Sequence, residues 1–231
     1  MSPAPPRARS LRLVHAGRIS YAEGLALQRR TADALRAGEG PETLLLVEHA
    51  PVITLGRGGR TEHLLASEAA LEAAGVALHP SDRGGDVTYH GPGQAVVYPI
   101  LDLAPDRCDV RRYVCDLEAA MIWTCAALGL RAGRKEGMIG CWLGGEVGPG
   151  PWRKIGAVGV HLSRWITTHG LALNLAPDMD HFGLIVPCGI AGHGVTSVAA
   201  ELGAAPSVET AHALLAGALA ERLGARLVGA D

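Results

Sequence analysis

Short β-prone runs separated by proline and glycine constrain the fold of this chain more than any other feature of its sequence. Residues 43–48 and 52–55 form two such runs that are interrupted at Pro51, which predicts a hairpin. Residues 87–89 and 95–101 predict two further strands on either side of a Gly-Pro-Gly turn. Links this short favour antiparallel neighbours over a sheet built from long crossovers.

Helical patterns stand between these strands without alternating strictly with them. Apolar spacing and composition predict further elements, namely helices over residues 21–36, 62–74, 110–128, 196–202 and 208–223, and strands over residues 11–15, 138–143, 155–162 and 165–175. Residues 1–10 are rich in proline and arginine and predict a disordered lead-in, not a signal peptide. We therefore expect the α+β class, as a single domain over residues 11–231 with a mixed, mostly antiparallel sheet flanked by helices.

Charge and cysteine usage exclude several classes of protein. The 231 residues include 21 basic and 23 acidic side chains, and a net charge of −2 disfavours a nucleic-acid-binding protein. The uncharged stretch 181–200 contains Pro187 and four glycines, so it predicts a loop and not a membrane-spanning helix. Five cysteines without a Cys-x-x-Cys pair predict reduced thiols in the cytoplasm, with Cys115 and Cys125 buried in a helix.

Lysine is rare, since only Lys135 and Lys154 stand among the 21 basic residues. Lys154 enters an apolar, glycine-rich predicted strand. Apolar surroundings disfavour an ammonium group, and arginine cannot be deprotonated in its place. Lys154 is therefore a candidate titratable amine, the alternative being a lysine that reaches solvent at a strand end. Lys135 is expected to be an ordinary loop residue.

Two other segments are candidates for chemistry. In residues 83–94 the glycines let backbone approach a ligand and Arg83 could pair with an anion, but the spacing is that of neither a Walker loop nor a dinucleotide fingerprint. The alternative for this segment is a tight hairpin. Cys188, between proline and glycine, is the best-placed thiol for a nucleophile, although most isolated cysteines are not catalytic. His90 and His169 are expected to be structural or to orient a substrate, and no metal-binding pattern is present.

Four segments taken together resemble the lipoate-protein ligase B family, the octanoyltransferases of lipoate biosynthesis. They are RGGDVTYHGPGQ (83–94), KIGAVGVH (154–161), THGLALNL (168–175) and PCGIAGHGVTS (187–197), and the resemblance extends over roughly residues 11–225. It implies the α+β fold of the biotin and lipoate ligase catalytic domain. It also implies protein lipoylation, in which octanoyl passes from octanoyl-acyl carrier protein to a lysine of lipoyl domains. The implied acceptors are the lipoyl domains of 2-oxoacid dehydrogenase complexes and the glycine cleavage H protein, and no ATP, metal or other cofactor is implied.

The same resemblance assigns roles to residues. It makes Cys188 the nucleophile that forms a thioester acyl-enzyme and Lys154 the acid/base. It assigns substrate binding to Arg83, Gly84, Gly85, Asp86, Val87, Thr88, Tyr89, His90, Ala157, Val158, Gly159, Gly170, Leu171 and Ala172. The main alternative is an ATP-dependent lipoate or biotin protein ligase of the related fold, which leaves Cys188 without a role. A non-catalytic binding module is the third possibility.

Overall fold

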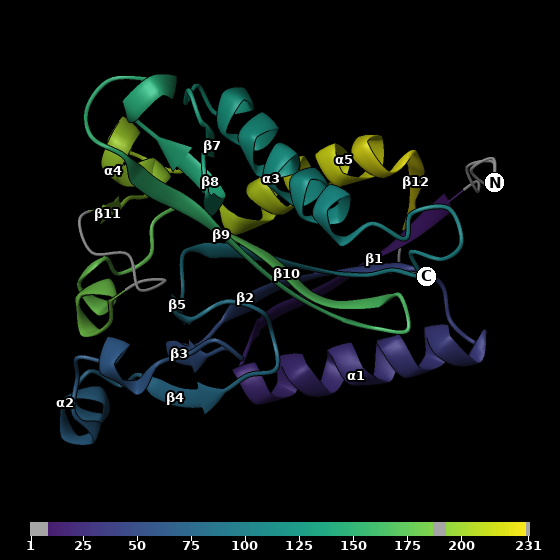
Figure 1. Ribbon diagram of the computed structural model, residues 1–231, viewed down its shortest axis with the longest axis horizontal. Helices are drawn as coiled ribbons and strands as arrows, with labels where there is room; N and C mark the ends of the chain where they lie inside the picture. Colours follow the sequence, from purple (N-terminus) through teal and green to yellow (C-terminus); the bar gives the residue numbers. More distant parts are fainter. Residues whose placement is uncertain (1–8, 187–192, 230–231) are drawn as a thin grey trace.

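The computed structural model describes residues 9–186 and 193–229, which form two sheets and the helices around them (Figure 1). The helices are α1 (Tyr21–Ala37), α2 (Glu68–Ala73), α3 (Val110–Ala127), α4 (Val198–Leu202) and α5 (Val208–Leu223), with 3-10 turns η1 (Thr61–His63), η2 (Gly145–Val147) and η3 (Asp180–Leu184). The strands are β1 (Arg9–Ile19), β2 (Thr43–His49), β3 (Val52–Leu55), β4 (Ala77–Pro80), β5 (Val87–His90), β6 (Gln94–Ile100), β7 (Gly133–Lys135), β8 (Met138–Leu143), β9 (Arg153–Ser163), β10 (Ile166–Asn174), β11 (Gly194–Val195) and β12 (Ala225–Val228).

The larger sheet has the strand order β12-β1-β2-β6-β10-β9-β8-β7, with β11 beside β9. Five neighbouring pairs, from β2–β6 through β8–β7, are antiparallel. The pairs β12–β1, β1–β2 and β11–β9 are parallel. A smaller sheet has the order β4-β3-β5. The predicted mixed, mostly antiparallel sheet is thus confirmed.

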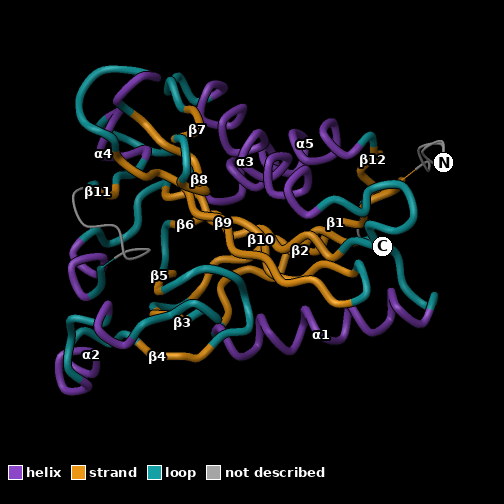
Figure 2. Tube along the Cα trace, in the orientation of Figure 1, coloured by secondary structure: helices purple, strands orange, loops and turns teal. Residues whose placement is uncertain are grey.

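Helices cover both faces of the larger sheet, with α3 and α5 on one side and α1 on the other (Figures 1 and 2). Successive side chains of a strand point to opposite faces. In β2, Leu44 and Leu46 join the core under α3 and α5, whereas Leu45 and Val47 join the core against α1. The unbroken apolar run in this strand is therefore explained by burial on both faces.

Local capping explains where the long helices begin and end. Ser20 and Glu23 form a capping box at the start of α1, and Gly38 ends the helix in the left-handed conformation. At the start of α5 the Ser207 side chain accepts from the Thr210 N–H, and Gly224 ends this helix. The predicted helices over residues 21–36 and 208–223 are confirmed. Within residues 9–186 and 193–229, no helix combines the length and apolar character needed to cross a membrane.

The predicted hairpin of residues 43–48 and 52–55 is wrong. β2 pairs with β1 and β6 in the larger sheet, and β3 pairs with β4 and β5 in the smaller one. The chain changes sheets at Ala50, whose N–H donates to Ile19 O (3.1 Å), and at Pro51, which has no N–H to donate. The Gly-Pro-Gly turn likewise leads from β5 to β6 in the other sheet, so these two strands do not pair.

The predicted helix over residues 62–74 is wrong in its first half. Leu64 forms a bridge with Ile185, and the Leu65 N–H donates to Leu184 O (2.9 Å). This backbone pairing holds the segment extended until Ser67 caps the shorter helix α2. A distant partner for the backbone therefore overrides local helix propensity.

Two smaller expectations also need correction. The lead-in ends earlier than residue 10, because β1 begins at Arg9, whose buried guanidinium pairs with Glu42 and Asp106. Cys115 is exposed on α3, although Cys125 on the same helix is buried as expected. The helix buries one face only, and Cys115 lies on the other.

Candidate active site

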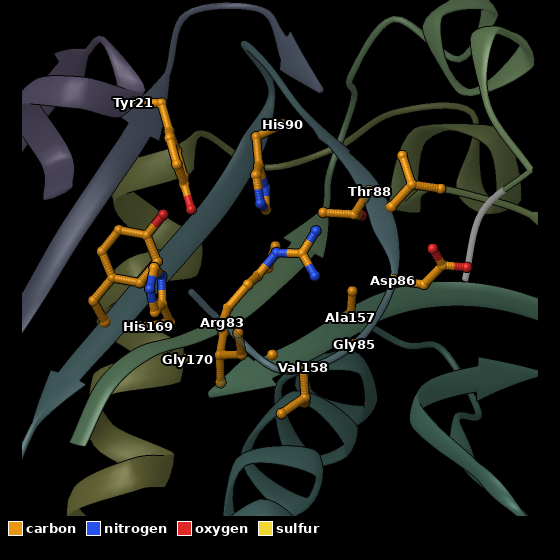
Figure 3. A pocket seen from close by; sticks show the side chains of 15 residues that line it. Tyr21, Arg83, Gly85, Asp86, Thr88, His90, Ala157, Val158, His169 and Gly170 are labelled. Atoms are coloured by element: carbon orange, nitrogen blue, oxygen red, sulfur yellow. The ribbon is translucent and has the colours of Figure 1, made fainter. Parts of the chain in front are cut away.

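A pocket with an empty volume of about 480 Å³ lies where β5 and the segment before it meet β9 and β10 (Figure 3). It is lined by Tyr21, Arg83, Gly85, Asp86, Val87, Thr88, His90, Tyr98, Ala157, Val158, Gly159, His169, Gly170, Leu171 and Ala172. Twelve of these are among the 14 residues predicted to bind substrate. The other two, Gly84 and Tyr89, line spaces that adjoin this pocket. We call it the main pocket.

Two glycines explain how the chain segments come together here. A Cβ atom on Gly170 would lie 2.3 Å from Val97 O, so β10 can approach β6 only without a side chain at this position. A Cβ atom on Gly159 would lie 3.0 Å from both Arg83 Cδ and Gly84 O. The absence of these side chains lets the Gly84 N–H donate to Val160 O (2.9 Å) and fixes the predicted binding segment on β9.

Arg83 is buried in the wall of the main pocket and is held by Thr54 of β3. Its Nη2 donates to Thr54 O (2.8 Å) and to Thr54 Oγ1 (2.7 Å). Nη1 donates to Gly84 O (3.2 Å). The guanidinium therefore joins the smaller sheet to the pocket wall and brings a positive charge there. Its pairing with an anion stays a prediction.

Asp86 connects the pocket to the chain before residue 187. Its Oδ2 is hydrogen-bonded to Nδ1 of His63, and its Oδ1 accepts from the Arg60 N–H (3.1 Å). The carbonyl oxygen of His63 in turn accepts from the Val186 N–H (2.7 Å). The Asp86 carboxylate thus binds η1 and the residue before it, and η1 in turn binds the backbone at Val186.

Aromatic rings close one end of the main pocket. Tyr21 and His169 lie at that end in Figure 3, and Asp86 and Thr88 lie at the other. The ring of Tyr21 stacks on His90 with centroids 6.3 Å apart. This end is therefore built from rings that come from several elements.

Hydrogen bonds fix the rings at this end. Nε2 of His49 lies 2.7 Å from the Tyr98 hydroxyl, and Nε2 of His169 lies 2.8 Å from Asp82 Oδ1. Burial lowers the pKa of His90 to about 3 and that of His49 to about 4. Burial also lowers the pKa of His169, against the opposing effect of Asp82. His49 and His90 are therefore neutral at pH 7.

Tyr21, His49 and Tyr98 were not predicted as site residues from the sequence. None of them belongs to a motif, and they come from α1, β2 and β6. The available signal was the rarity of tyrosine. The chain has four tyrosines, and two of them, Tyr21 and Tyr98, line the main pocket.

Lys154 lines a second, smaller pocket, which shares Thr88, Ala157 and Ala172 with the main pocket. The lysine is 9% exposed, so the alternative of a lysine reaching solvent at a strand end does not fit. Its Nζ lies 5.2 Å from the centroid of the Trp142 ring, within the range of a cation–π interaction. The two pockets meet at these shared residues, and the amine lies in the second pocket.

Cys188 lies outside the described residues. The chain that precedes it is bonded to His63 at Val186. The chain that follows it returns in β11, where Val195 pairs with Lys154 and the Thr196 N–H donates to Lys154 O (2.9 Å). Its proximity to Lys154 stays a prediction, although the chain on both sides of residues 187–192 is attached to the walls of these pockets.

Lys135 was expected to be an ordinary loop residue, and this prediction is wrong. It lies in β7, with its Nζ 2.9 Å from Nε2 of His193 and 5.7 Å from the centroid of Trp142. Both lysines of the chain therefore lie near the same indole. The signal that was available was the rarity of lysine, which the sequence analysis applied to Lys154 alone.

Among residues 9–186 and 193–229, no three His, Cys, Asp or Glu side chains gather as they would around a metal ion. The polar groups that the described residues bring to the two pockets are an amine, a guanidinium, hydroxyls, amides, imidazoles and Asp86.

Comparison with known proteins places the chain in a family. Residues 20–220 match the lipoyl protein ligase A/B catalytic domain. The chain is 50% identical over 199 residues to an octanoyltransferase of Myxococcus xanthus, covering 86% of this chain and 56% of that protein. It is 49% identical over 210 residues to an octanoyltransferase of Chloroflexus aggregans, covering 90% of this chain and 93% of that protein.

Solved structures share the fold at low sequence identity. The structure of a bipartite lipoate protein ligase and its E2 lipoyl domain from Thermoplasma acidophilum contains a chain that matches with a TM-score of 0.69 and 15% identity, over 98% of this chain and 88% of that one. The biotin protein ligase of Aquifex aeolicus matches with a TM-score of 0.52 and 12% identity, over 92% of this chain and 70% of that one. The predicted fold class is thus confirmed, and the chain belongs to the lipoyl protein ligase A/B catalytic domain family and, within it, to the octanoyltransferases.

Proposed function

We propose that this protein transfers an octanoyl group from octanoyl-acyl carrier protein to a lysine of a lipoyl domain, through a thioester on Cys188 and with Lys154 as the acid/base. Residues 11–231 act as a single catalytic domain in this proposal. The observation that carries it is the junction of the main pocket with the pocket that contains the Lys154 amine, at Thr88, Ala157 and Ala172. An acyl chain in the first pocket would have its carbonyl carbon beside the amine.

The main pocket suits an eight-carbon chain. Val87, Val158 and Leu171 supply apolar walls, and Gly159 and Gly170 leave space between them. Each buried CH₂ group contributes about 0.8 kcal/mol, so an octanoyl chain could gain several kcal/mol. His90, which is neutral at pH 7, lines the far end of the pocket, so it does not place a charge against the chain terminus.

The first half-reaction forms the acyl-enzyme. The Cys188 thiol gives its proton to the Lys154 amine, and the resulting thiolate attacks the carbonyl carbon of the donor thioester. A new carbon–sulfur bond forms to Cys188, and the bond to the pantetheine sulfur breaks. The Lys154 ammonium returns the proton to that sulfur, and the carrier protein leaves as a thiol.

The second half-reaction forms the amide. The neutral amine of the acceptor lysine attacks the carbonyl carbon, the carbon–nitrogen bond forms, and the bond to Cys188 breaks. Lys154 accepts the proton that the amine loses and passes it to the Cys188 sulfur. The energy comes from exchanging a thioester for an amide, so this scheme requires neither ATP nor a metal.

The partners follow from the proposed reaction. The donor is an acyl carrier protein, and the acceptors are the lipoyl domains of 2-oxoacid dehydrogenase complexes and the glycine cleavage H protein. We place the reaction in the cytoplasm, because Cys108, Cys115, Cys125 and Cys141 are free thiols, which suits a reducing compartment.

A donor-exchange assay separates this function from that of an ATP-dependent ligase. Desalted enzyme is incubated with a lipoyl domain and octanoyl-acyl carrier protein in the presence of a chelator and without ATP. We expect an octanoylated lipoyl domain by mass spectrometry, and no product when free octanoate and MgATP replace the donor. Product only with octanoate and MgATP would establish the ligase activity instead.

A further inference from the structure

A third space, an open groove with an empty volume of about 1150 Å³, adjoins both pockets. Gly85, Asp86, Val158 and Gly159 line it together with the main pocket, and Lys154 lines it together with the second pocket. The groove therefore extends from Lys154, and the roles predicted from the sequence do not include a ligand for it.

The proposed function, on which this inference rests, requires such a space. A thioester has an acyl side and a sulfur side, which diverge from one carbonyl carbon. If the acyl chain occupies the main pocket and the carbonyl lies beside Lys154, the sulfur side must leave through a space that adjoins both. The groove meets this requirement.

Two exposed arginines, Arg57 and Arg60, lie in the loop that contributes Gly58 to the groove. Residues 56–60 form a loop whose N–H groups bond along the predicted binding segment, with Arg57 N to Arg83 O (3.0 Å) and Gly58 N to Gly85 O (3.0 Å). Gly58 itself lines the groove. The side chains of Arg57 and Arg60 on either side of it are exposed, and in the part of the chain that the structure describes neither enters an ion pair.

One wall of the groove is apolar. Val114 of α3 and Met138 and Ile139 of β8 line it, and Ile139 is 56% exposed. A large apolar side chain held at the edge of a groove is available for contact with a ligand. The groove thus has an apolar wall near the reacting amine, and the loop that contributes Gly58 to it carries two exposed arginines.

We propose that this groove binds the phosphopantetheine arm of the acyl donor, and that Arg57 and Arg60 pair with its phosphate. The arm matches the groove in chemistry, because it joins a thioester sulfur to an aliphatic diamide chain and ends in a phosphodiester. Guanidinium groups pair well with phosphate oxygens. The N–H groups of Arg57 and Arg60 donate to Arg83 O and to Asp86 Oδ1, so the backbone of both arginines is held in place without a donor.

Donors of increasing length test the inference. Octanoyl-pantetheine, octanoyl-4′-phosphopantetheine and octanoyl-acyl carrier protein are compared by kcat/KM, with one lipoyl domain as acceptor. We expect the wild-type enzyme to prefer the phosphorylated arm over octanoyl-pantetheine by roughly tenfold, a value in keeping with two exposed charge pairs. The double variant Arg57→Ala, Arg60→Ala should lose this preference, whereas Arg30→Ala, which removes an exposed charge from α1, should keep it.

The outcomes separate this inference from the proposed function. Equal use of the two small donors by the wild-type enzyme, or an unchanged preference in the double variant, would overturn the assignment of the groove. A rise in KM for the lipoyl domain with an unchanged donor preference would show that the groove serves the acceptor and would equally overturn it. If no thioester supports transfer, it is the proposed function that fails. The preference of the wild-type enzyme should also weaken as salt is raised.

Discussion

Gly140 leaves the space in which the side chain of Lys154 lies. A Cβ atom at position 140 would stand 2.6 Å from Cε of the lysine and 3.3 Å from its Nζ. The N–H of Gly140 donates to Oε1 of the buried Glu118 (2.8 Å), so α3 holds this part of β8 in place. The position of the amine therefore depends on a glycine that no motif identified.

Substitution of this glycine should impair the reaction and also lower the melting temperature, because its φ is 134° and a Cβ atom would lie 2.7 Å from Gly156 O. In Gly140→Ala the added methyl group displaces the lysine, and misplacing a reacting group by about 1 Å can cost roughly 100-fold in rate. The measurement is the rate of octanoyl transfer to a lipoyl domain, together with the melting temperature. Gly129→Ala is the matched control, because Gly129 also has a positive φ (88°) but nothing within 4 Å of its Cβ position. Equal rates in the two variants would contradict this role for Gly140.

Acid should destabilise the protein through its buried histidines. In the unfolded chain a histidine has a pKa near 6.5, whereas in the folded protein the pKa of His49 is about 4 and that of His90 about 3. The unfolded state therefore binds more protons as the pH falls below 6.5. The stabilisation is fully present above that value and is lost progressively toward pH 4, by roughly 3 kcal/mol for His49 alone.

Urea unfolding between pH 7.5 and 4.5 checks this pH dependence. The free energy of unfolding of the wild-type protein should fall steeply over this range. In His49→Gln it should fall less, because one of the groups that take up a proton on unfolding is gone. Parallel curves for the two proteins would show that His49 does not titrate as described.

Two glycine substitutions should change stability in opposite directions. Gly170→Ala places a methyl group 2.3 Å from Val97 O in the centre of the sheet and should cost roughly 1–3 kcal/mol. Gly217 lies on an exposed face of α5 with nothing within 4 Å, so Gly217→Ala should stabilise the helix by about 0.5–1 kcal/mol. Thermal unfolding of both variants beside the wild type tests the pair. A lower melting temperature for Gly217→Ala, or none of the expected loss for Gly170→Ala, would count against these packing assignments.

Local patterns predicted individual elements better than their pairing. Helix α5 was predicted with the bounds Val208–Leu223 because its caps and apolar spacing lie within the segment itself. The partners of β2 and β3 could not be predicted in the same way, since the two strands are separated by two residues and still enter different sheets. Strand pairing depends on backbone groups that are distant in the sequence, and hydrophobic pattern does not specify them.

In the candidate site, too, residues close together in the sequence were predicted and residues brought together from distant segments were not. Motifs brought together 12 of the residues that line the main pocket, because each motif keeps its members close in sequence. The ring cluster of Tyr21, His49 and Tyr98 was missed because it assembles one residue at a time from separate elements. The contact of Lys135 with His193 was missed for the same reason, since 58 positions separate these residues.

The thioester proposed on Cys188 makes the protein an acyl-enzyme, which can be measured directly. The enzyme is incubated with octanoyl-acyl carrier protein alone, and its intact mass is determined beside those of Cys188→Ala and Cys115→Ala. We expect one octanoyl group to be added to the wild-type protein and to Cys115→Ala, in which an exposed thiol has been removed, and none to be added to Cys188→Ala. An octanoyl adduct on Cys188→Ala, or its absence from a wild-type enzyme that still transfers octanoyl to a lipoyl domain, would contradict the account.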